Sequence, residues 1–236
     1  MKMQVVGVSE GVLSYLRVNI ITGSFSPGER LNEISLSSSL GISRAPLREA
    51  LRILENEQLV VSVPRRGCYV TPISMDNCKD IYNTRIMMET FAIETLEAQS
   101  MNQLYNVEAA LNKFYDLSFP DDNDPYGRFD YLKSIANFHI NLIKSAGNRR
   151  LILLYDSIFP SLARYQSLYT YNPQLMSESE DEHTEILSYI KKRKYSDARE
   201  FMRFHINKFI PMIEDKVEAL SKKCEIAYPD FNKMSN

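Results

Sequence analysis

The sequence predicts a mainly α-helical fold made of two different domains that meet near residue 70. Glycine is scarce, with 8 in 236 residues, about half of the usual share of roughly 7%, which is typical of a helix-rich chain with few glycine turns. Six of the eight glycines lie in the first 67 residues. The hydrophobic content of 44% is ordinary for a globular protein. These observations favour a short front domain with tight turns and a glycine-poor helical remainder.

Charge and cysteine content limit the kinds of partner and the cellular compartment that we expect for the protein. Residues 1–75 carry eight Lys and Arg against six Asp and Glu, whereas residues 76–236 carry twenty against twenty-four, so a basic binding surface belongs to the front domain. Three cysteines without C-x-x-C spacing fit reduced thiols in a cytoplasm better than disulfides or a zinc framework. The sequence has neither a secretory signal nor an apolar run of about 18 residues. We therefore expect a cytoplasmic protein without a membrane partner.

Three helices are predicted at the start of the chain. Apolar residues at helical spacing indicate a helix over residues 9–22. Two shorter helices follow over residues 33–40 and 44–57, where Asn32 and Ser43 stand as N-cap residues. Only three residues separate these two helices, so the pair is predicted to form a helix-turn-helix.

The second helix of that pair has two distinct faces. Arg44, Arg48 and Arg52 recur every four residues on one side. An adjacent face is apolar and comprises Leu47, Ala50, Leu51 and Leu54. One face can therefore pack while the other binds an anionic partner such as DNA. The alternative is that the arginines form a solvated face paired with Glu49 and Glu55.

A β-hairpin is predicted after these helices. Residues 59–63 and 68–71 are rich in β-branched and aromatic side chains, and the Pro64-Arg65-Arg66-Gly67 segment between them places two arginines at the tip. A helix-turn-helix followed by a hairpin with a basic tip offers two contacts to DNA, one in the major groove and one at phosphates or the adjoining minor groove.

These residues carry a family resemblance. The segments Pro27-Gly28-x-Arg30-Leu31-Asn32-Glu33, Leu40-Gly41-Ile42-Ser43-Arg44-Ala45-Pro46-Leu47-Arg48-Glu49-Ala50-Leu51 and Arg65-Arg66-Gly67 resemble the winged helix of GntR-family bacterial transcription regulators. The resemblance implies that Ser43, Arg44 and Arg48 contact operator DNA from the recognition helix, and that Arg66 and Gly67, with Arg65 beside them, do so from the wing. Some relatives have a further basic contact where this chain has Ile34.

From residue 75 onward the pattern predicts an all-α helical bundle. Six helices are expected, near residues 76–99, 101–117, 126–146, 149–170, 176–193 and 195–221. Prolines and an Ala146-Gly147-Asn148 stop separate them. The overall prediction is a mainly α protein with an N-terminal winged helix-turn-helix over residues 1–74, a C-terminal bundle over 75–224 and a tail over 225–236.

The chain has three histidines, and each falls on the apolar stripe of a different predicted helix. His139, His183 and His205 should all point inward, where neutral imidazoles can hold a transition metal ion such as Zn²⁺ or Ni²⁺. Their spacings of 44 and 22 residues do not show that they meet. Ordinary hydrogen-bonded core histidines remain the alternative.

The bundle also carries a resemblance. Tyr82-x-x-Arg85-x-x-x-Glu89, Phe138-His139-x-x-Leu142, Glu182-His183-x-x-Ile186-Leu187 and the late His205 are similar to the FCD effector domain of the FadR subgroup, and six helices indicate its VanR-like branch. In metal-binding relatives the three histidines are ligands together with an aspartate one turn before the first of them, where this chain has Ile135.

Two further residues of the bundle, Asp130 and Arg85, need an interpretation of their own. Asp130 is expected on the opposite side of its helix and cannot replace the missing aspartate. Arg85 can meet a carboxylate effector bidentately, or it can pair with Glu89 four residues on.

We therefore expect a homodimeric transcription regulator that binds double-stranded operator DNA and responds to a small molecule, which Arg85 suggests is a carboxylate. The alternative is a metal-dependent enzyme with the winged helix as an interaction module. Acidic residues near His183, from Glu178 to Glu182, are interpreted as stabilising the helix dipole at the start of its helix, which leaves that enzyme without a general base.

Overall fold

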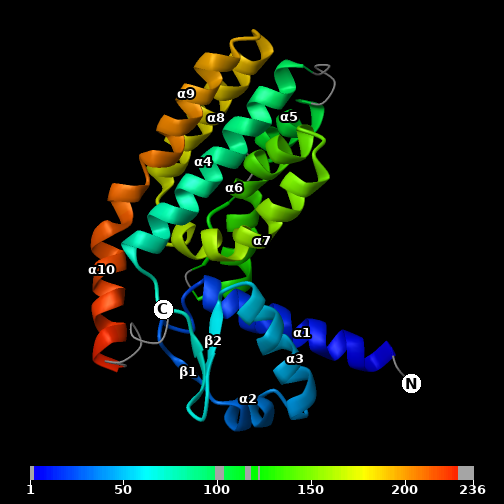
Figure 1. Cartoon of the computed structure of the whole chain (residues 1–236), viewed down its shortest axis with the longest axis vertical. Coiled ribbons are helices and arrows are strands. Elements are labelled where there is room, and N and C mark those ends of the chain that lie inside the picture. Colours follow the sequence, from blue (N-terminus) through cyan, green and yellow to red (C-terminus); the bar gives the residue numbers. More distant parts are fainter. Residues whose placement is uncertain (1–2, 99–103, 115–117, 122, 228–236) are drawn as a thin grey trace. The chain divides into compact units, whose positions relative to one another are not determined.

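The computed structural model describes residues 3–98, 104–114, 118–121 and 123–227 (Figure 1). The chain divides into two compact units, one made of residues 1–75 with 215–236 and the other of residues 76–214. In the described part of the chain, no helix is long and apolar enough to span a membrane.

The first unit contains the three predicted N-terminal helices, α1 (Met3–Ile21), α2 (Glu33–Ser39) and α3 (Arg44–Asn56) (Figure 1). Helix α1 packs against α3, and α3 also contacts α2. The apolar residues that predicted these helices, among them Leu16, Ile20 and Leu47, are buried between them. The predicted helix-turn-helix is therefore confirmed.

Local hydrogen bonds define the turn between α2 and α3. The side chain of Asn32 accepts hydrogen bonds from the backbone N–H groups of Ile34 and Ser35, as an N-cap should. Gly41 has a φ of +65°, and the N–H groups of Gly41 and Ile42 close the end of α2 on Ser38 and Ser37. Ser43 stands at the N-cap position of α3, but its side chain makes no capping hydrogen bond, so that detail of the prediction is wrong.

A three-stranded antiparallel sheet completes the first unit. Strands β2 (Val60–Val63) and β3 (Gly67–Val70) form the predicted hairpin. A third strand, β1 (Arg30–Leu31), was not predicted and pairs with β3 in the order β1-β3-β2. It extends over only two residues, too few to show an alternating pattern in the sequence.

The second unit is a helical bundle. Its helices are α4 (Met75–Glu97), α5 (Tyr105–Phe114), α6 (Pro125–Ser145), α7 (Arg149–Gln166), α8 (Pro173–Lys191) and α9 (Tyr195–Asn207). The last helix, α10 (Ile210–Ala227), begins in this unit, and its residues from Asp215 onward belong to the first unit. Asp124, Asn148 and Asn172 cap α6, α7 and α8 through their side chains. These caps place the breaks where the sequence predicted them.

The prediction of the last helix is wrong in one respect. The continuous helix expected over residues 195–221 is interrupted at Lys208 and Phe209, so the described chain has seven helices after residue 74 instead of six. Pro211 explains the break, because proline lacks a backbone N–H and fits only the first turn of a helix. The helix count therefore does not support the VanR-like branch.

Candidate functional site

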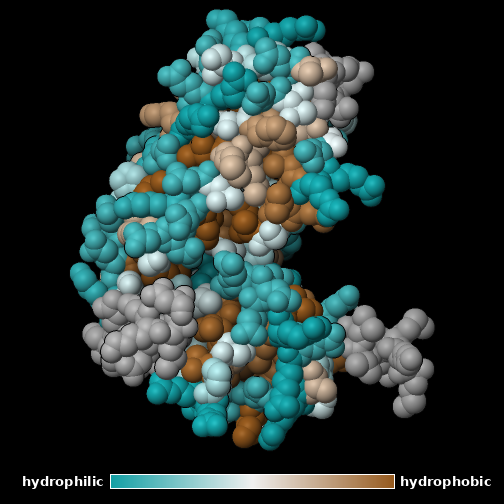
Figure 2. All heavy atoms as spheres, in the orientation of Figure 1, coloured by the Kyte–Doolittle hydropathy of each residue, from teal (hydrophilic) through white to brown (hydrophobic). Residues whose placement is uncertain are grey.

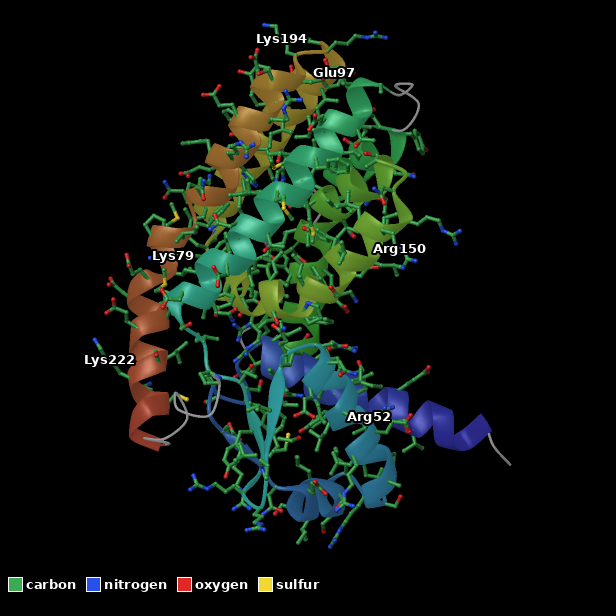
Figure 3. All side chains as sticks on the ribbon, in the orientation of Figure 1. Arg52, Lys79, Glu97, Arg150, Lys194 and Lys222 are labelled. Atoms are coloured by element: carbon green, nitrogen blue, oxygen red, sulfur yellow. The ribbon has the colours of Figure 1, made fainter. Side chains whose placement is uncertain are left out.

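The arginine face of α3 is exposed. Arg44, Arg48 and Arg52 are accessible to solvent, whereas Leu47, Ala50, Leu51 and Leu54 are buried on the adjacent face. Figure 3 shows Arg52 on α3. Ser43 at the start of the helix is also exposed. The predicted separation of a packed face from a basic face is confirmed.

Arg48 is held by an acidic residue that sequence reasoning missed. Its Nε donates a hydrogen bond of 2.7 Å to Glu33 Oε2 on α2, although 64% of the Arg48 side chain remains exposed. Of the two carboxylates that the alternative interpretation paired with the arginines, Glu55 accepts a hydrogen bond from the backbone N–H of Ser62 instead. An ion pair this exposed is worth about 0–1 kcal/mol, so Arg48 can leave Glu33 at little cost when a phosphate or base competes.

The hairpin tip gathers three arginines. Arg65, Arg66 and Gly67 are exposed, as predicted. Arg65 has a φ of +64°, the left-handed region that a residue other than glycine rarely adopts and that costs about 1–2 kcal/mol. Arg30, on β1, lies with its guanidinium over Gly67, since a Cβ added to Gly67 would be 3.3 Å from Arg30 Nε. The position of Arg30 beside the tip could not be predicted without strand β1, which pairs with β3.

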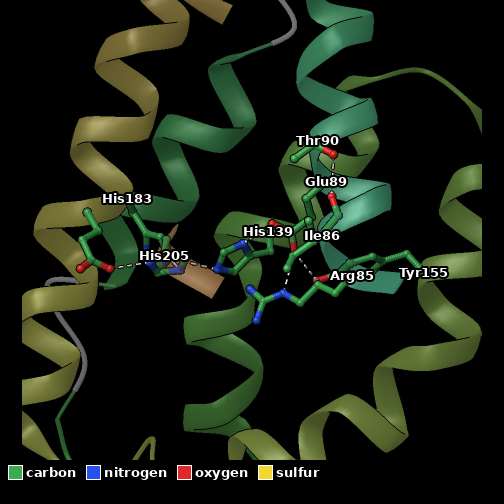
Figure 4. Close-up of polar contacts among 9 residues, drawn as sticks. Arg85, Ile86, Glu89, Thr90, His139, Tyr155, His183 and His205 are labelled. Carbon is green, nitrogen blue, oxygen red and sulfur yellow. Dashed lines mark hydrogen bonds and ion pairs between the residues drawn. The ribbon is translucent and has the colours of Figure 1, made fainter. Parts of the chain in front are cut away.

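The three histidines meet in the bundle. His139 on α6, His183 on α8 and His205 on α9 are each at most 3% exposed. His183 Nε2 lies 3.0 Å from His139 Nε2 and 3.1 Å from His205 Nε2. The close-up in Figure 4 shows these rings facing one another from separate helices. The three histidines therefore lie together, which their spacing along the sequence could not show.

Two carboxylates orient the rings. His139 Nδ1 lies 2.6 Å from Glu89 Oε2, and His205 Nδ1 lies 2.6 Å from Glu182 Oε2. A carboxylate at Nδ1 assigns the ring proton to that nitrogen and leaves a lone pair on Nε2. The lone pairs of His139 and His205 therefore both face His183 Nε2, which has at most one proton to donate.

The donor set fits a metal ion. Nitrogen ligands about 2.0–2.1 Å from zinc lie roughly 3 Å from one another at tetrahedral or octahedral angles, and His183 Nε2 lies at that distance from both other Nε2 atoms. The ligand atoms of all three rings lie within 4.8 Å of one another. Burial lowers the pKa of all three histidines well below 6.5, helped by Arg85 at His139 and by the neighbouring imidazoles at His183. The rings are thus neutral near pH 7, the form that binds metal.

The structure gives Glu182 a different role from the one expected from the sequence. Glu182 was interpreted as a dipole-stabilising residue at a helix start, but α8 begins at Pro173, so Glu182 lies well inside the helix. Its other oxygen accepts a hydrogen bond of 2.6 Å from Lys208 Nζ. Only the contact with His205, 23 residues away, reveals the role of Glu182.

Arg85 makes the i,i+4 ion pair that its spacing predicted. Arg85 Nε donates a hydrogen bond of 2.7 Å to Glu89 Oε1, and the Tyr155 hydroxyl donates to the same oxygen at 3.2 Å (Figure 4). Arg85 Nη2, however, is buried and has no hydrogen-bond partner among the described residues. An unpaired buried guanidinium nitrogen is costly, and Arg85 is one of the residues that line the cavity beside the histidines.

The cavity itself is small, with a volume of about 20 Å³. A space of this size has room for a metal ion or roughly one water-sized group. Gln166 and Thr170 also line it. Ile135, one turn before His139, faces the same space. Asp130 is exposed and pairs with Lys133 instead, so it lies away from the site as expected.

Comparison with known proteins gives matches to both parts of the chain. Residues 8–70 match the family model "Bacterial regulatory proteins, gntR family", and residues 80–208 match the FCD domain. The gluconate operon transcriptional repressor of Bacillus licheniformis is 28% identical over 210 residues, which cover 87% of this chain and 83% of that protein. The HTH-type transcriptional repressor GlaR of Escherichia coli is 27% identical over 205 residues, covering 85% and 93%.

Solved structures give the same picture of the fold. Escherichia coli McbR/YncC aligns with a TM-score of 0.68 at 18% identity and covers 89% of this chain and 98% of its own. A GntR transcriptional regulator of Rhodococcus sp. RHA1 aligns with a TM-score of 0.64 at 21% identity, covering 89% and 97%.

Proposed function

This chain belongs to the GntR family of bacterial transcriptional regulators and carries an FCD domain, and we propose that it binds operator DNA as a homodimer controlled by a metal ion and a small carboxylate effector. Such a protein acts in the cytoplasm, where its operator lies. A coupling of about 1–3 kcal/mol between effector and DNA would change operator affinity roughly 5- to 150-fold.

The observation that carries the proposed DNA contact is the basic face of α3. Arg44 and Arg48 are exposed on a helix whose adjacent face is packed in the core, and the hydroxyl of Ser43 makes no capping hydrogen bond. Arginine recognises guanine bidentately in the major groove and phosphates elsewhere. Arg65, Arg66 and the backbone at Gly67 would reach the DNA from the hairpin, with Arg30 beside them.

An operator obtained by selection from random duplexes tests this assignment. Arg44→Ala and Arg48→Ala should each weaken binding of that duplex by about 1–3 kcal/mol, measured by fluorescence anisotropy. Lys79→Ala is the matched control, because it removes one exposed positive charge from the bundle. Unchanged binding in both arginine variants would remove α3 from the interface.

The metal part of the proposal rests on the three Nε2 atoms. His139, His183 and His205 would hold Zn²⁺ or Ni²⁺, and Glu89 and Glu182 would keep two of the rings in the required tautomer. When bound, the ion would supply a positive centre for an anionic effector, with Arg85 Nη2 as a second anchor. Elemental analysis after incubation with zinc should give one ion per chain, and His205→Ala should lose it.

Exposed apolar residues support a homodimer. On α4, Met87 and Phe91 are 62% and 45% exposed, and on α7, Leu153 and Leu154 are 60% and 55% exposed. Figure 2 shows apolar side chains gathered over these two helices. Patches of this kind mark protein–protein interfaces. Phe91→Glu should therefore shift sedimentation towards a monomer and weaken binding to a two-fold operator.

The metal-dependent enzyme is the weaker proposal. The relatives are named as transcriptional regulators and repressors. The residues that line the histidine cavity include no carboxylate to act as a general base. Turnover of a metabolite by the purified protein would reverse this preference.

A further inference from the structure

A groove on the bundle lies between α5 and α8 and shares no lining residue with the histidine cavity. Its volume is about 440 Å³, compared with about 20 Å³ at the histidines. Pockets that bind small organic molecules measure roughly 300–1,000 Å³. This α5–α8 groove is therefore large enough to take a whole small molecule, which the histidine cavity is not.

Helix α8 contributes to both sites through two adjacent faces. His183 lines the histidine cavity, and the next residue, Thr184, lines the α5–α8 groove. Leu187, Ser188 and Lys191 follow Thr184 at intervals of three, four and seven residues and line the groove as well. A ligand in the groove would therefore contact the same helix that carries one of the three histidines.

The groove combines an apolar base with polar groups. Leu111 of α5 and Leu187 of α8 line it, and each is only 5% exposed. Asn112 and Ser188 lie beside these leucines in the lining, and their amide and hydroxyl groups can both donate and accept hydrogen bonds. A mostly apolar lining with a few polar groups is typical of sites for small organic ligands.

Positive charge is in excess in this lining. It contains two lysines, Lys191 and Lys192, against one carboxylate, Glu108. Lys191 Nζ lies 2.9 Å from Glu108 Oε1, and the two side chains are 49% and 40% exposed. An ion pair this exposed contributes little to stability. An anionic ligand can therefore replace Glu108 as the partner of Lys191.

The lysines are not required to cap the end of α8, which lies at Lys191. Unpaired carbonyl groups at the C-terminus of a helix attract cations. Here the carbonyl groups of Ser188, Tyr189 and Ile190 already accept hydrogen bonds from the backbone N–H groups of residues 192–194. The ammonium groups can therefore bind an anion in the groove without leaving these carbonyls unpaired.

We propose that the α5–α8 groove binds a small amphipathic monoanion. Its apolar body lies on Leu111 and Leu187, and its charged group pairs with Lys191 and Lys192 in place of Glu108. The excess of one lysine over the carboxylates favours a single negative charge, and the two leucines favour an apolar body. Because the site is separate from the histidine cavity, this inference does not depend on the metal ion or on its effector.

Methyl NMR of the full chain tests the site, with 3-phenylpropionate as the probe. The leucine methyl signals of Leu111 and Leu187 should shift until the groove is saturated, whereas those of Leu153 and Leu154, which are exposed on α7, should not. Two further compounds separate the contributions. 3-Phenylpropanol has the apolar body without the charge, and acetate has the charge without the body. Each should bind on the order of 10-fold more weakly than the probe.

Two substitutions should change the affinity for the probe in opposite directions. Lys191→Met should weaken binding by about 2- to 10-fold, because it removes the cationic partner. Glu108→Gln should strengthen binding by about 2- to 5-fold, because it removes the competing carboxylate and keeps the shape of the side chain. Lys194→Met is the matched control and should bind the probe unchanged, because Lys194 belongs to the same basic segment but does not line the groove (Figure 3).

The outcomes are distinct from those of the proposed function. Absence of a saturable shift at Leu111 and Leu187 overturns the site, and so do equal shifts at the exposed leucines of α7, which would indicate adhesion to any apolar surface. Equal affinity for the acid and the alcohol, or unchanged affinity in both Lys191→Met and Glu108→Gln, overturns the recognition of charge. Each of these failures leaves zinc binding and operator binding to their own tests.

Discussion

Acidification should destabilise the helical bundle because its three histidines are buried in the neutral form. His139, His183 and His205 have pKa values well below 6.5 in the folded protein, chiefly because burial disfavours the charged imidazole. In the unfolded chain each regains an ordinary pKa of about 6.5. Below pH 6.5 the unfolded state thus binds more protons than the folded state. The contribution to stability is present above pH 6.5 and is lost as the pH falls.

The magnitude follows from linkage. For a histidine that stays neutral in the folded state, lowering the pH from 7.5 to 5.5 costs about 1.4 kcal/mol of unfolding free energy. The chain has three histidines and all of them lie in this cluster, so the sum is about 4 kcal/mol. This is a large part of the roughly 5–15 kcal/mol that stabilises a typical domain.

Urea unfolding at a series of pH values measures the effect. The experiment uses a chelator so that no metal ion competes with protons, and it follows helix content by circular dichroism. His205→Gln should remove about a third of the pH dependence, because it removes one of the three proton-binding groups of the unfolded chain. A free energy of unfolding that is constant from pH 7.5 to 5.5, or histidine signals that titrate near 6.5 in the folded protein, would refute the reasoning.

Three further predictions concern the other parts of the chain. Arg65→Ala and Arg66→Ala should each make the salt dependence of operator binding shallower by about one unit of slope, and unchanged slopes would exclude the hairpin tip. Asn32→Ala should destabilise the first unit by about 1 kcal/mol in urea unfolding, because it removes the cap of α2. Ser43→Ala should cause no such loss, because the Ser43 hydroxyl makes no capping hydrogen bond. Equal losses of stability in the two variants would contradict this account. Burial raises the pKa of Cys78 to about 12 from 9.0, so at pH 8 its thiolate should be about a thousandfold scarcer than in the unfolded chain. Iodoacetamide should label Cys78 only after unfolding, and rapid labelling of the native protein would count against its burial.

Features governed by neighbouring residues were predictable. The cap at Asn32, the turn at Gly41, the two faces of α3 and the ion pair between Arg85 and Glu89 all depend on residues within about one helical turn of each other. The missed break in the last helix belongs to the same class, because Pro211 was a visible local signal that received too little weight.

Features that join distant segments were not predictable from such rules. Strand β1 exists because Arg30 and Leu31 pair with β3, almost forty residues further on. Glu33 on α2 accepts a hydrogen bond from Arg48 on α3. Likewise, Glu182 orients His205 from another helix, and nothing in its local sequence distinguishes it from the acidic residues around it.

The sequence by itself determined the two-part helical architecture, the basic face of α3 and which side chains of the bundle point inward, because helical periodicity and capping are local properties. Only the tertiary structure decided that the three histidines meet, that two carboxylates set their tautomers, and that Ile135 and Arg85 line their cavity. The physical reason is that packing between helices, not spacing along the chain, sets the distances between residues far apart in sequence.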